Sequence, residues 1–487
     1  MQKITIDPIT RLEGHGRIDI FLDDEGNVAN AYLVIPELRG FEKFVEGRPV
    51  EELPDITPRI CGVCPEAHHM ASVKACDAVY HVEVPSAAKK LRELFYSAFY
   101  VADHMTHFYI LAGPDFVLGP DAPPAERNIL GLIHKVGLEV GGRVIRARGM
   151  AMDIIGMLGG RKVHPLFGVP GGVGKAITEE ERAQIEAIAR EEVDFALFSL
   201  QLFRQVVLDN SAYRDMILSD VFTLPTYYMG LVDEQNRVNF YDGMVRVVDP
   251  EGREFVKYAP HEYTQVIAER VEPWTYLKFP FLKKIGWKGL VAGKDSGVYQ
   301  ATPLSRLNAA DGMATPRAQE AYEEFYATLG GKPVHHTLAT HWARLIEMLY
   351  AAERLLELAT DPEITSPHVR NIPTATPTEG VGIVEAPRGT LTHHYITDER
   401  GLVVKCNLIV GTTNNYASIA MSIRQAAKGL IRKGQVVTEG LLNRIEMAFR
   451  AYDPCFGCAT HALPGQMPLE VRIYDAEGNL KDVISRR

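Results

Sequence analysis

Alternating apolar and polar residues mark the beginning of the chain. Ile18, Ile20 and Leu22 alternate with polar neighbours, and the acidic, glycine-containing run at 23–27 follows directly. A period of two is typical of a strand with one buried face, and such a run favours a tight turn. The pattern therefore predicts strands over residues 1–35 that are joined by a hairpin.

Further along the chain, apolar residues recur at steps of three and four. This spacing places them on one face of an α-helix. Thr178 precedes three consecutive glutamates, which combines an N-cap with acidic first-turn residues that suit the helix dipole. The predicted helices span residues 86–111, 178–208, 337–358, 416–432 and 438–451.

The segments between these helices lack the helical spacing of apolar residues. Residues 160–176 are rich in glycine and proline and predict a connection, while 230–260 and 371–415 contain short β-branched runs between turn signals. The pattern predicts a mainly α fold with peripheral β-strands. Because both ends of the chain carry reactive side chains, we expect one integrated domain over residues 1–461.

Composition and charge limit the classes of function. The 487 residues include 52 lysines and arginines against 62 aspartates and glutamates, a formal net charge of −10. An acidic chain lacks the basic surface of a nucleic-acid-binding protein. No apolar run approaches the ~20 residues that span a bilayer, and the first residues lack the apolar core of a signal peptide. We expect a cytoplasmic protein with no membrane span.

Four of the six cysteines form two CxxC pairs, Cys61 with Cys64 and Cys455 with Cys458. Two such turns supply four thiolates, a set that suits a soft or borderline metal. The pairs of a zinc ribbon lie within ~20 residues of each other, whereas these lie near opposite ends of the chain. Spacing alone leaves open a zinc tetrathiolate, an iron–sulfur cluster, a catalytic metal, or two redox dithiols.

The residues around the cysteines narrow these alternatives. The motifs RxCGxCxxxH at 59–68 and DPCxxCxxH at 453–461 occur together with characteristic segments at 7–17, 39–42 and 385–391. In this combination the chain resembles the large, catalytic subunit of nickel–iron hydrogenases, closest to the cytoplasmic, multisubunit, bidirectional type. The resemblance implies a helical-bundle core and reversible cleavage of dihydrogen.

The resemblance also assigns the four thiolates. Cys61 and Cys455 are implied to be terminal nickel ligands, while Cys64 and Cys458 bridge nickel to an iron that carries carbon monoxide and cyanide. Metal coordination lowers the pKa of a thiol from ~8.5, so a terminal thiolate can accept and release a proton near neutral pH. Cys455 is the thiolate expected to do so, and Glu13 matches the carboxylate that takes the proton onward.

Several polar residues are implied to surround the iron. Arg388 matches the arginine that donates to one cyanide and offsets the negative charge of the centre. Thr412 matches the hydroxyl donor to the second cyanide, and Pro387 lies in the same cofactor-binding turn. Asp453 and Asp115 are expected to complete this polar surround.

Two further sites follow from the resemblance. His68 is implied to donate a hydrogen bond to the bridging sulfur of Cys64 and so to orient it. Glu42, His461 and the backbone carbonyl of Leu408 match the ligands of a separate magnesium ion, for which oxygen donors are suitable.

The tail at 462–487 matches an extension that a nickel-dependent maturation protease removes after His461, once nickel-insertion factors have acted. Residues 469–474 alternate like a strand. Electrons need an exit, so the resemblance implies flavin and iron–sulfur electron-transfer partners in addition to an iron–sulfur small subunit.

Three other hypotheses remain. A non-catalytic scaffold of the respiratory-complex type would lack the nickel cysteines, whereas this chain keeps all four together with Arg388 and Glu13. A hydrogen sensor with little turnover commonly lacks a cleavable tail. A zinc-stabilised structural protein would contain zinc alone.

Overall fold

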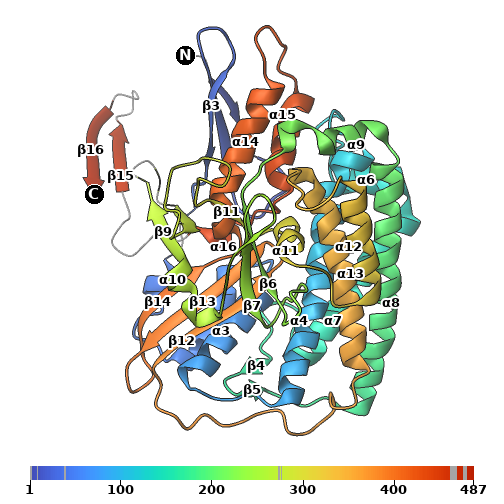
Figure 1. Ribbon diagram of the computed structural model, residues 1–487, viewed down its shortest axis with the longest axis vertical. Coiled ribbons are helices and arrows are strands. Elements are labelled where there is room, and N and C mark those ends of the chain that lie inside the picture. Colours follow the sequence, from blue (N-terminus) through green and yellow to red (C-terminus); the bar gives the residue numbers. More distant parts are fainter. Residues whose placement is uncertain are drawn as a thin grey trace.

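The structure is a computed structural model that describes residues 3–7, 9–37, 40–272, 275, 277–460, 469–474 and 480–486. A layer of long helices forms one side of the molecule, and small sheets with shorter helices form the other (Figure 1). This mainly helical architecture with peripheral strands confirms the predicted fold class. No helix in the described ranges is both long and apolar enough to cross a bilayer.

The helical layer is built around α13, which packs against α8 and α4. α13 is buried on nearly all sides, as expected for a helix at the centre of a bundle. At the start of α8, the Glu181 N–H donates to Thr178 Oγ1 and the Thr178 N–H donates to Glu181 Oε2. This reciprocal capping fixes the predicted helix start. The layer comprises α4 (Ser86–Thr106), α7 (Leu138–Gly159), α8 (Glu179–Phe203), α12 (Pro316–Thr328) and α13 (Thr340–Ala359).

Helix α3 (Pro65–Val79) lies across an antiparallel sheet of β12 (Glu379–Ala386), β13 (Gly389–Thr397) and β14 (Val403–Ile409). Two glycines of β12 permit the close approach. A Cβ atom at Gly382 would lie 2.1 Å from the carbonyl oxygen of Ala71. This packing holds the first residue of α3 near the turn between β12 and β13.

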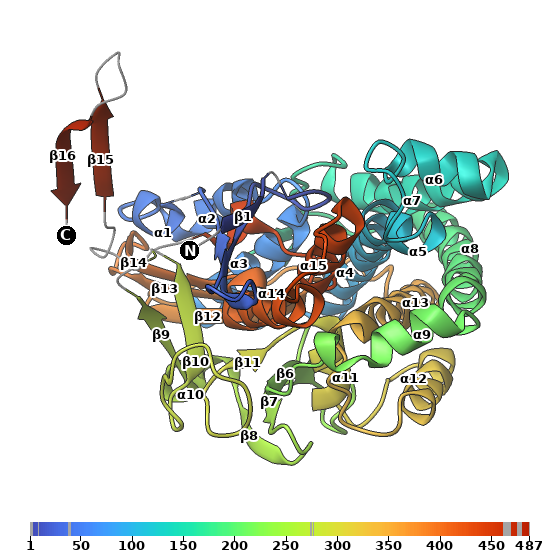
Figure 2. The same cartoon turned by 90° about the horizontal axis from the view of Figure 1, so that it is seen from above.

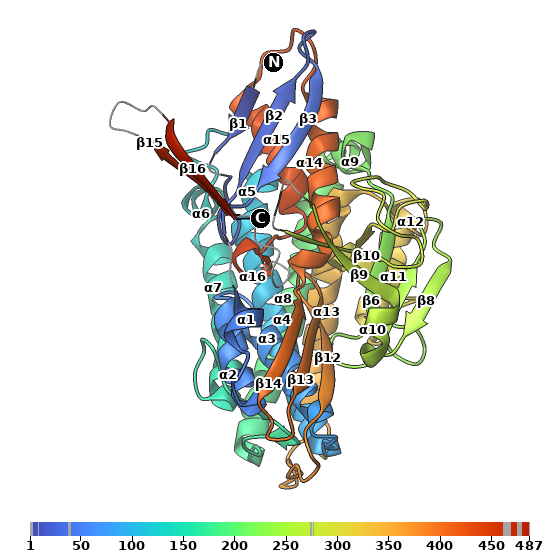
Figure 3. The ribbon, with the colours of Figure 1, turned by 90° about the vertical axis from the view of Figure 1, so that its left-hand side faces the viewer.

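The two ends of the chain meet beside this unit. β1 (Lys3–Ile6), β2 (Arg17–Leu22) and β3 (Val28–Val34) form the predicted antiparallel sheet, and β3 packs against α14 (Tyr416–Leu430). α14 in turn packs on α15 (Glu439–Arg450), and this group stands together at one end of the molecule (Figure 3). The segment after β1 thereby reaches the segment after α15.

The remaining described elements are short. β6, β7 and β8 lie in the predicted β region, and β11 joins them through a parallel pairing with β6. The strands are β4 (Gly168–Val169), β5 (Gly172–Val173), β6 (Tyr227–Val232), β7 (Met244–Val248), β8 (Glu254–Tyr258), β9 (Ile267–Val271), β10 (Lys278–Leu282) and β11 (Tyr299–Gln300). The helices are α1 (Phe41–Phe44), α2 (Leu53–Ile56), α5 (Gly113–Val117), α6 (Ile129–Val136), α9 (Ser211–Leu218), α10 (Tyr263–Val266), α11 (Pro303–Ala309) and α16 (Phe456–Ala459).

β15 (Leu469–Tyr474) and β16 (Leu480–Arg486) pair with each other as an antiparallel hairpin. The strand predicted at 469–474 is confirmed. The hairpin stands apart from the main body (Figure 2).

All five predicted helices are present within a few residues of their predicted ends. The helix at 86–111 continues past α4 as a π-helical turn over His107–Ala112, and that at 178–208 ends in a second π-helical turn. Helices α3, α7 and α12 and the shorter helices were not predicted from the sequence. α7 contains repeated glycines, which disfavour helices in isolation, so tertiary packing must compensate for that preference.

Candidate metal centre

The first CxxC turn joins a 3₁₀ turn to helix α3. Cys61 ends the turn at Thr57–Ile60, and Cys64 is the N-cap of α3, with Pro65 in the first helical position. The N–H groups of Val63 and Cys64 donate to Cys61 Sγ over 3.3 and 3.1 Å. These hydrogen bonds hold the two sulfurs on the same side of the turn, 3.0 Å apart.

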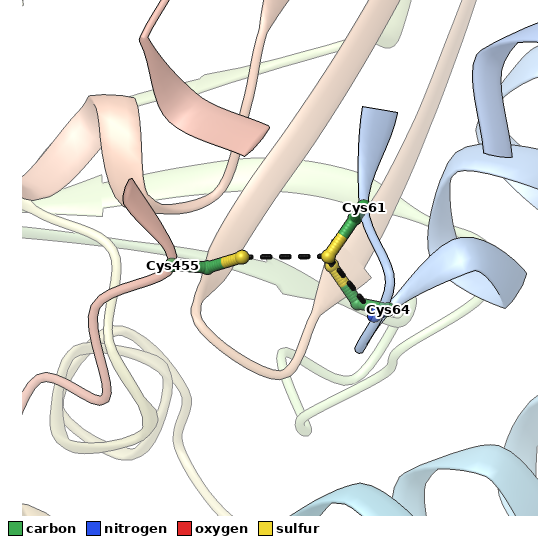
Figure 4. Close-up of side chains that lie close together, drawn as sticks. All are labelled: Cys61, Cys64 and Cys455. Carbon is green, nitrogen blue, oxygen red and sulfur yellow. Dashed lines mark hydrogen bonds between the residues drawn. The ribbon is translucent and has the colours of Figure 1, made fainter. Parts of the chain in front are cut away.

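Cys455 reaches the same place from the other end of the chain. Its Sγ lies 3.3 Å from that of Cys61, and the sulfurs of Cys61, Cys64 and Cys455 are all within 4.8 Å of one another (Figure 4). All three cysteine side chains are buried. Cys458 lies in α16, but its side chain is outside the described part, as is His461. A buried group of three soft donors fits the predicted metal centre.

The backbone before Cys455 is strained. Asp453 has φ 53°, in the left-handed region that aspartate tolerates better than most residues. The Cys455 N–H donates to Thr412 Oγ1 over 3.0 Å. Thr412 thus lies directly beside the cysteine turn, at the start of a 3₁₀ turn over Thr412–Asn415.

Glu13 connects the N-terminal segment to this turn. It forms a parallel β-bridge with Cys455, and the Phe456 N–H donates to its carbonyl oxygen over 3.1 Å. Its Oε2 lies 3.0 Å from Cys455 Sγ and accepts the Gly457 N–H over 2.9 Å. A carboxylate at hydrogen-bond distance from a thiol can exchange a proton with it directly.

Arg388 is in the two-residue turn between β12 and β13. Its Nη1 lies 3.0 Å from Asp103 Oδ2 and its Nη2 lies 2.9 Å from Asp453 Oδ2, and we call these three residues the Arg388 cluster. Burial raises the pKa of both aspartates, and Arg388 opposes that shift. The two carboxylates and the thiols of Cys64 and Cys455 raise the pKa of Arg388, although burial alone would lower it. The guanidinium therefore keeps its charge.

Asp115 was expected in this surround, but the structure places it in a different group. It accepts hydrogen bonds from Arg11, Arg450 and Asn443, and we call Asp115, Arg11 and Arg450 the Asp115 cluster. Burial would raise the pKa of Asp115, but the two arginines hold it below its usual range. The carboxylate that joins Asp453 at Arg388 is Asp103. The prediction for Asp115 needs this correction because it came from the resemblance alone, without any tertiary contact of Asp115.

Sequence reasoning also missed His107. It lies in the π-helical turn after α4, and its Nδ1 is 2.8 Å from Asp453 Oδ1. Burial lowers the pKa of His107 well below its usual range, so the ring is neutral. The available signal was the spacing of Asp103 and His107, one turn apart on a helix whose buried residues are mostly apolar.

Pro387 lies in the Arg388 turn, and His68 lies in α3. The Pro387 carbonyl accepts a hydrogen bond from Arg306 over 3.0 Å, which anchors the turn. His68 is fully buried one helical turn after Cys64, and its Nδ1 lies 3.1 Å from His393 Nε2.

Two of the predicted magnesium ligands, Glu42 and the Leu408 carbonyl, lie beside a lysine, and the third, His461, lies outside the described residues. Lys278 donates to Glu42 Oε1 over 2.7 Å, to the Leu408 carbonyl over 3.2 Å and to Asn407 Oδ1 over 3.1 Å, and it pairs with Glu269. The carboxylate and carbonyl oxygens suit a hard cation. In this structure, however, the positive charge among them is the ammonium group of Lys278, which the sequence analysis missed.

The chain is similar to known nickel-dependent hydrogenases. Residues 39–127 and 124–461 match the family model described as nickel-dependent hydrogenase, and residues 3–38 match one described as HoxL-like. The chain is 51% identical over 480 residues to an F420-non-reducing hydrogenase iron-sulfur subunit of Archaeoglobus profundus, covering 99% of each. It is 40% identical over 499 residues to the NAD-reducing hydrogenase HoxS subunit beta of Cupriavidus necator, covering 100% of each.

A solved structure shows the same architecture. An NAD+-reducing NiFe-hydrogenase in the H2-reduced state superposes with a TM-score of 0.88 at 38% identity, covering 95% of this chain and 100% of that one.

Proposed function

The chain belongs to the nickel-dependent hydrogenase family, and we propose that it is the subunit in which dihydrogen is reversibly split into protons and electrons at a buried nickel–iron centre. The observation that carries this proposal is the convergence of Cys61, Cys64 and Cys455 with Glu13, from segments at opposite ends of the chain.

Cys61, Cys64, Cys455 and Cys458 would hold the metals through their thiolates, which are suitable donors for nickel and iron. When bound, the nickel–iron centre supplies heterolytic cleavage of dihydrogen. We propose that the iron carries carbon monoxide and cyanide, and that Arg388, Thr412 and Pro387 line the space for them. The charged guanidinium beside the thiols supports this, because it offsets the negative charge of thiolates and cyanides.

The proton released in this reaction leaves through protein groups. Cys455 Sγ holds it first and transfers it to Glu13 Oε2, 3.0 Å away. The Gly457 N–H holds that oxygen in place, so the carboxylate is already oriented when the proton arrives. Asp453 and Asp103 fix Arg388 from both sides and keep it directed at the centre.

The electrons require partner proteins. We propose that they pass first to an iron–sulfur small subunit, with flavin and iron–sulfur subunits beyond it. In support, one relative is by name the beta subunit of an NAD-reducing hydrogenase. The cytoplasmic location stays a prediction.

We propose that the tail after His461 is removed by a nickel-dependent protease once nickel-insertion factors have loaded the centre. The division of the chain into a catalytic domain at 1–461 and an extension at 462–487 is part of this proposal. Intact-mass measurement of the active enzyme tests it, because a nickel-loaded, fully active chain that retains Arg487 contradicts it.

The proposed magnesium ion would bind Glu42, the Leu408 carbonyl and His461. Lys278 would have to give up its hydrogen bonds to Glu42 and Leu408, and it would keep Glu269 and Asn407 as partners. Magnesium analysis of the active enzyme decides the question. An active enzyme without magnesium would show that Lys278 supplies the positive charge instead.

Infrared spectroscopy and metal analysis of the purified complex test the main proposal. We expect one nickel and one active-site iron per chain, carbonyl and cyanide bands, and dihydrogen uptake with an artificial electron acceptor. Zinc alone without those bands would refute it, and bands with negligible uptake would indicate a hydrogen sensor.

A further inference from the structure

The turn that carries Arg388 is held by its backbone as well as by the Arg388 side chain. The carbonyl oxygens of Ala386 and Pro387 each accept a hydrogen bond from Arg306 over 3.0 Å. The next carbonyl, that of Arg388 itself, accepts a hydrogen bond from Asn415 Nδ2 over 2.7 Å. Side chains from two other segments therefore fix three successive carbonyls of this turn.

Arg306 lies in α11, is fully buried, and uses every donor of its guanidinium group. A guanidinium has five N–H groups and accepts no hydrogen bond, so the direction of each contact is fixed. Nε and Nη2 donate to the two carboxylate oxygens of Glu347 over 2.6 and 2.7 Å, and Nη1 donates to Glu385 Oε2 over 3.0 Å. The remaining N–H groups are those that donate to the carbonyls of Ala386 and Pro387.

The two glutamates keep Arg306 in one place. Glu347 lies in α13, at the centre of the helical layer, and Glu385 lies in β12, and both are fully buried. Burial alone would lower the pKa of Arg306, but the two carboxylates hold it well above its usual range, so the guanidinium stays charged. The bidentate pair with Glu347 also fixes the plane of the guanidinium. Movement of Arg306 would leave buried charges unpaired, which is costly, so it gives the turn a fixed point of attachment.

Asn415 attaches the same turn to a second segment. It is the last residue of the 3₁₀ turn after β14 and is buried. Its Oδ1 accepts the Ala301 N–H over 2.8 Å, which sets the orientation of the amide and leaves Nδ2 to donate to the Arg388 carbonyl. The backbone at Gly389 is packed closely as well, because a Cβ atom there would lie 2.6 Å from the carbonyl oxygens of both Ala301 and Gly411. The turn therefore has little room to move.

We propose that Arg306 and Asn415 are positioning residues, which hold Arg388 at the metal centre through the backbone carbonyls of its turn. This inference rests on the proposed function, in which Arg388 lines the space for the iron ligands. Asp103 and Asp453 direct the guanidinium of Arg388, whereas Arg306 and Asn415 set the place of its backbone. A misplacement of about 1 Å can lower a rate by about 10²-fold, even when the substitution is remote from the reacting atoms.

A double-mutant cycle distinguishes positioning from a general structural role. If Arg306 and Asn415 act through Arg388, their replacement has little further effect once Arg388→Leu has removed the guanidinium. A residue that only stabilises the fold would lower activity by the same factor in both backgrounds, because independent effects add in free energy. The quantity to compare is dihydrogen uptake per nickel, which corrects for chains that do not assemble.

The test uses two substitutions, each in the parent complex and in Arg388→Leu. Arg306→Lys keeps the charge but cannot replace the planar fork of donors, and Asn415→Ala removes the donor to the Arg388 carbonyl. We expect each to lower uptake per nickel about tenfold in the parent and less than about twofold in Arg388→Leu. Arg92→Lys is the matched control, because Arg92 is also buried and donates to a carboxylate, Asp77, and to two backbone carbonyls. It should leave uptake per nickel unchanged.

Equal fold losses in the parent and in Arg388→Leu, or unchanged uptake per nickel in the parent, overturn the inference. If Arg306→Lys loads no nickel, Asn415→Ala decides the matter alone. If neither variant loads nickel, the two residues are needed for assembly rather than for positioning, and the inference is likewise overturned. A parent complex without carbonyl and cyanide bands refutes the proposed function itself, an outcome distinct from the failure of this inference.

Discussion

The Arg388 cluster and the Asp115 cluster contain the same kinds of side chain in opposite proportions. In the first, one guanidinium lies between two aspartates, and burial raises the pKa of both carboxyl groups. In the second, one aspartate lies between two guanidinium groups, which hold its pKa below the usual range. The thiols of Cys64 and Cys455 raise the pKa of Arg388, whereas the described partners of Asp115 are the two arginines and Asn443. We therefore propose that the same kinds of side chain serve reactivity in the Arg388 cluster and anchoring in the Asp115 cluster.

The Asp115 cluster anchors the segment that carries Glu13. Arg11 is two residues before Glu13, and Arg450 of α15 donates to the Thr10 carbonyl over 3.2 Å. Thr10 Oγ1 also donates to Glu446 over 2.9 Å. One short segment is thus structural at residue 11 and, in our proposal, catalytic at residue 13.

The largest effect is expected at Glu13, the residue of this segment with the proposed catalytic role. Glu13→Gln keeps the size of the side chain but cannot take the proton from Cys455. We expect hydrogen–deuterium exchange to fall by about 10³-fold, within the range of a lost acid–base group, with unchanged nickel content. Exchange measured by mass spectrometry checks this. Glu25→Gln, in the exposed hairpin turn, is the control. Unchanged exchange would remove Glu13 from the proton path.

Arg450→Met should affect stability rather than chemistry. It leaves Asp115 and Glu446 buried with less compensating charge, and breaking a buried ion pair typically costs about 3–5 kcal/mol. The free energy of unfolding, measured by denaturant titration, should fall by that amount. Arg444→Met on the same helix removes only an exposed pair with Asp121 and should cost under about 1 kcal/mol. Equal losses in the two variants would contradict the anchoring role.

Arg388→Leu is expected to lower activity rather than stability, the reverse of the result expected for Arg450→Met. It removes the cation that faces both aspartates and the proposed iron ligands. Loss of one such electrostatic group typically lowers kcat about 10²–10³-fold, or roughly 2.7–4 kcal/mol. Dihydrogen uptake per nickel measures the effect, and Arg388→Lys should recover part of it through charge alone. A variant that loses stability but keeps full uptake per nickel would place Arg388 with the anchoring residues.

Local patterns were sufficient to predict much of the fold and the cysteine turns. The CxxC pairs and Glu13 belong to short motifs, and the capping of α8 by Thr178 and Glu181 is a contact between near neighbours. The closure of Cys61 on Cys455 was implied by the resemblance to nickel–iron hydrogenases, because thiolate chemistry and spacing alone also allowed two separate redox dithiols.

The missed features depend on tertiary contacts. Asp103 and Lys278 acquire partners from distant elements, so neighbouring positions in the sequence do not identify those partners. The role of the glycines of β12 is clear only in the folded protein, where α3 packs directly against them. Asp115 was expected beside Arg388 because of the resemblance alone, which does not specify which arginine the carboxylate contacts.

Glu192 is a third kind of buried carboxyl group, which has no arginine partner among the described residues. It is fully buried in α8, and neither carboxylate oxygen has a hydrogen-bond partner among the residues the structure describes. Burial raises the pKa of Glu192 to about 8 from 4.5. The folded state therefore holds a proton that the unfolded chain releases above about pH 4.5, and this costs stability as the pH rises toward 8.

Glu192→Met should remove that cost and stabilise the protein at pH 7 by roughly 1–3 kcal/mol, with a gain that shrinks toward pH 4.5. Unfolding titrations at both pH values measure the gain, and Glu191→Gln, at the exposed neighbouring position, should change stability by under about 0.5 kcal/mol. A gain independent of pH would mean that packing rather than the buried carboxyl group sets the stability here.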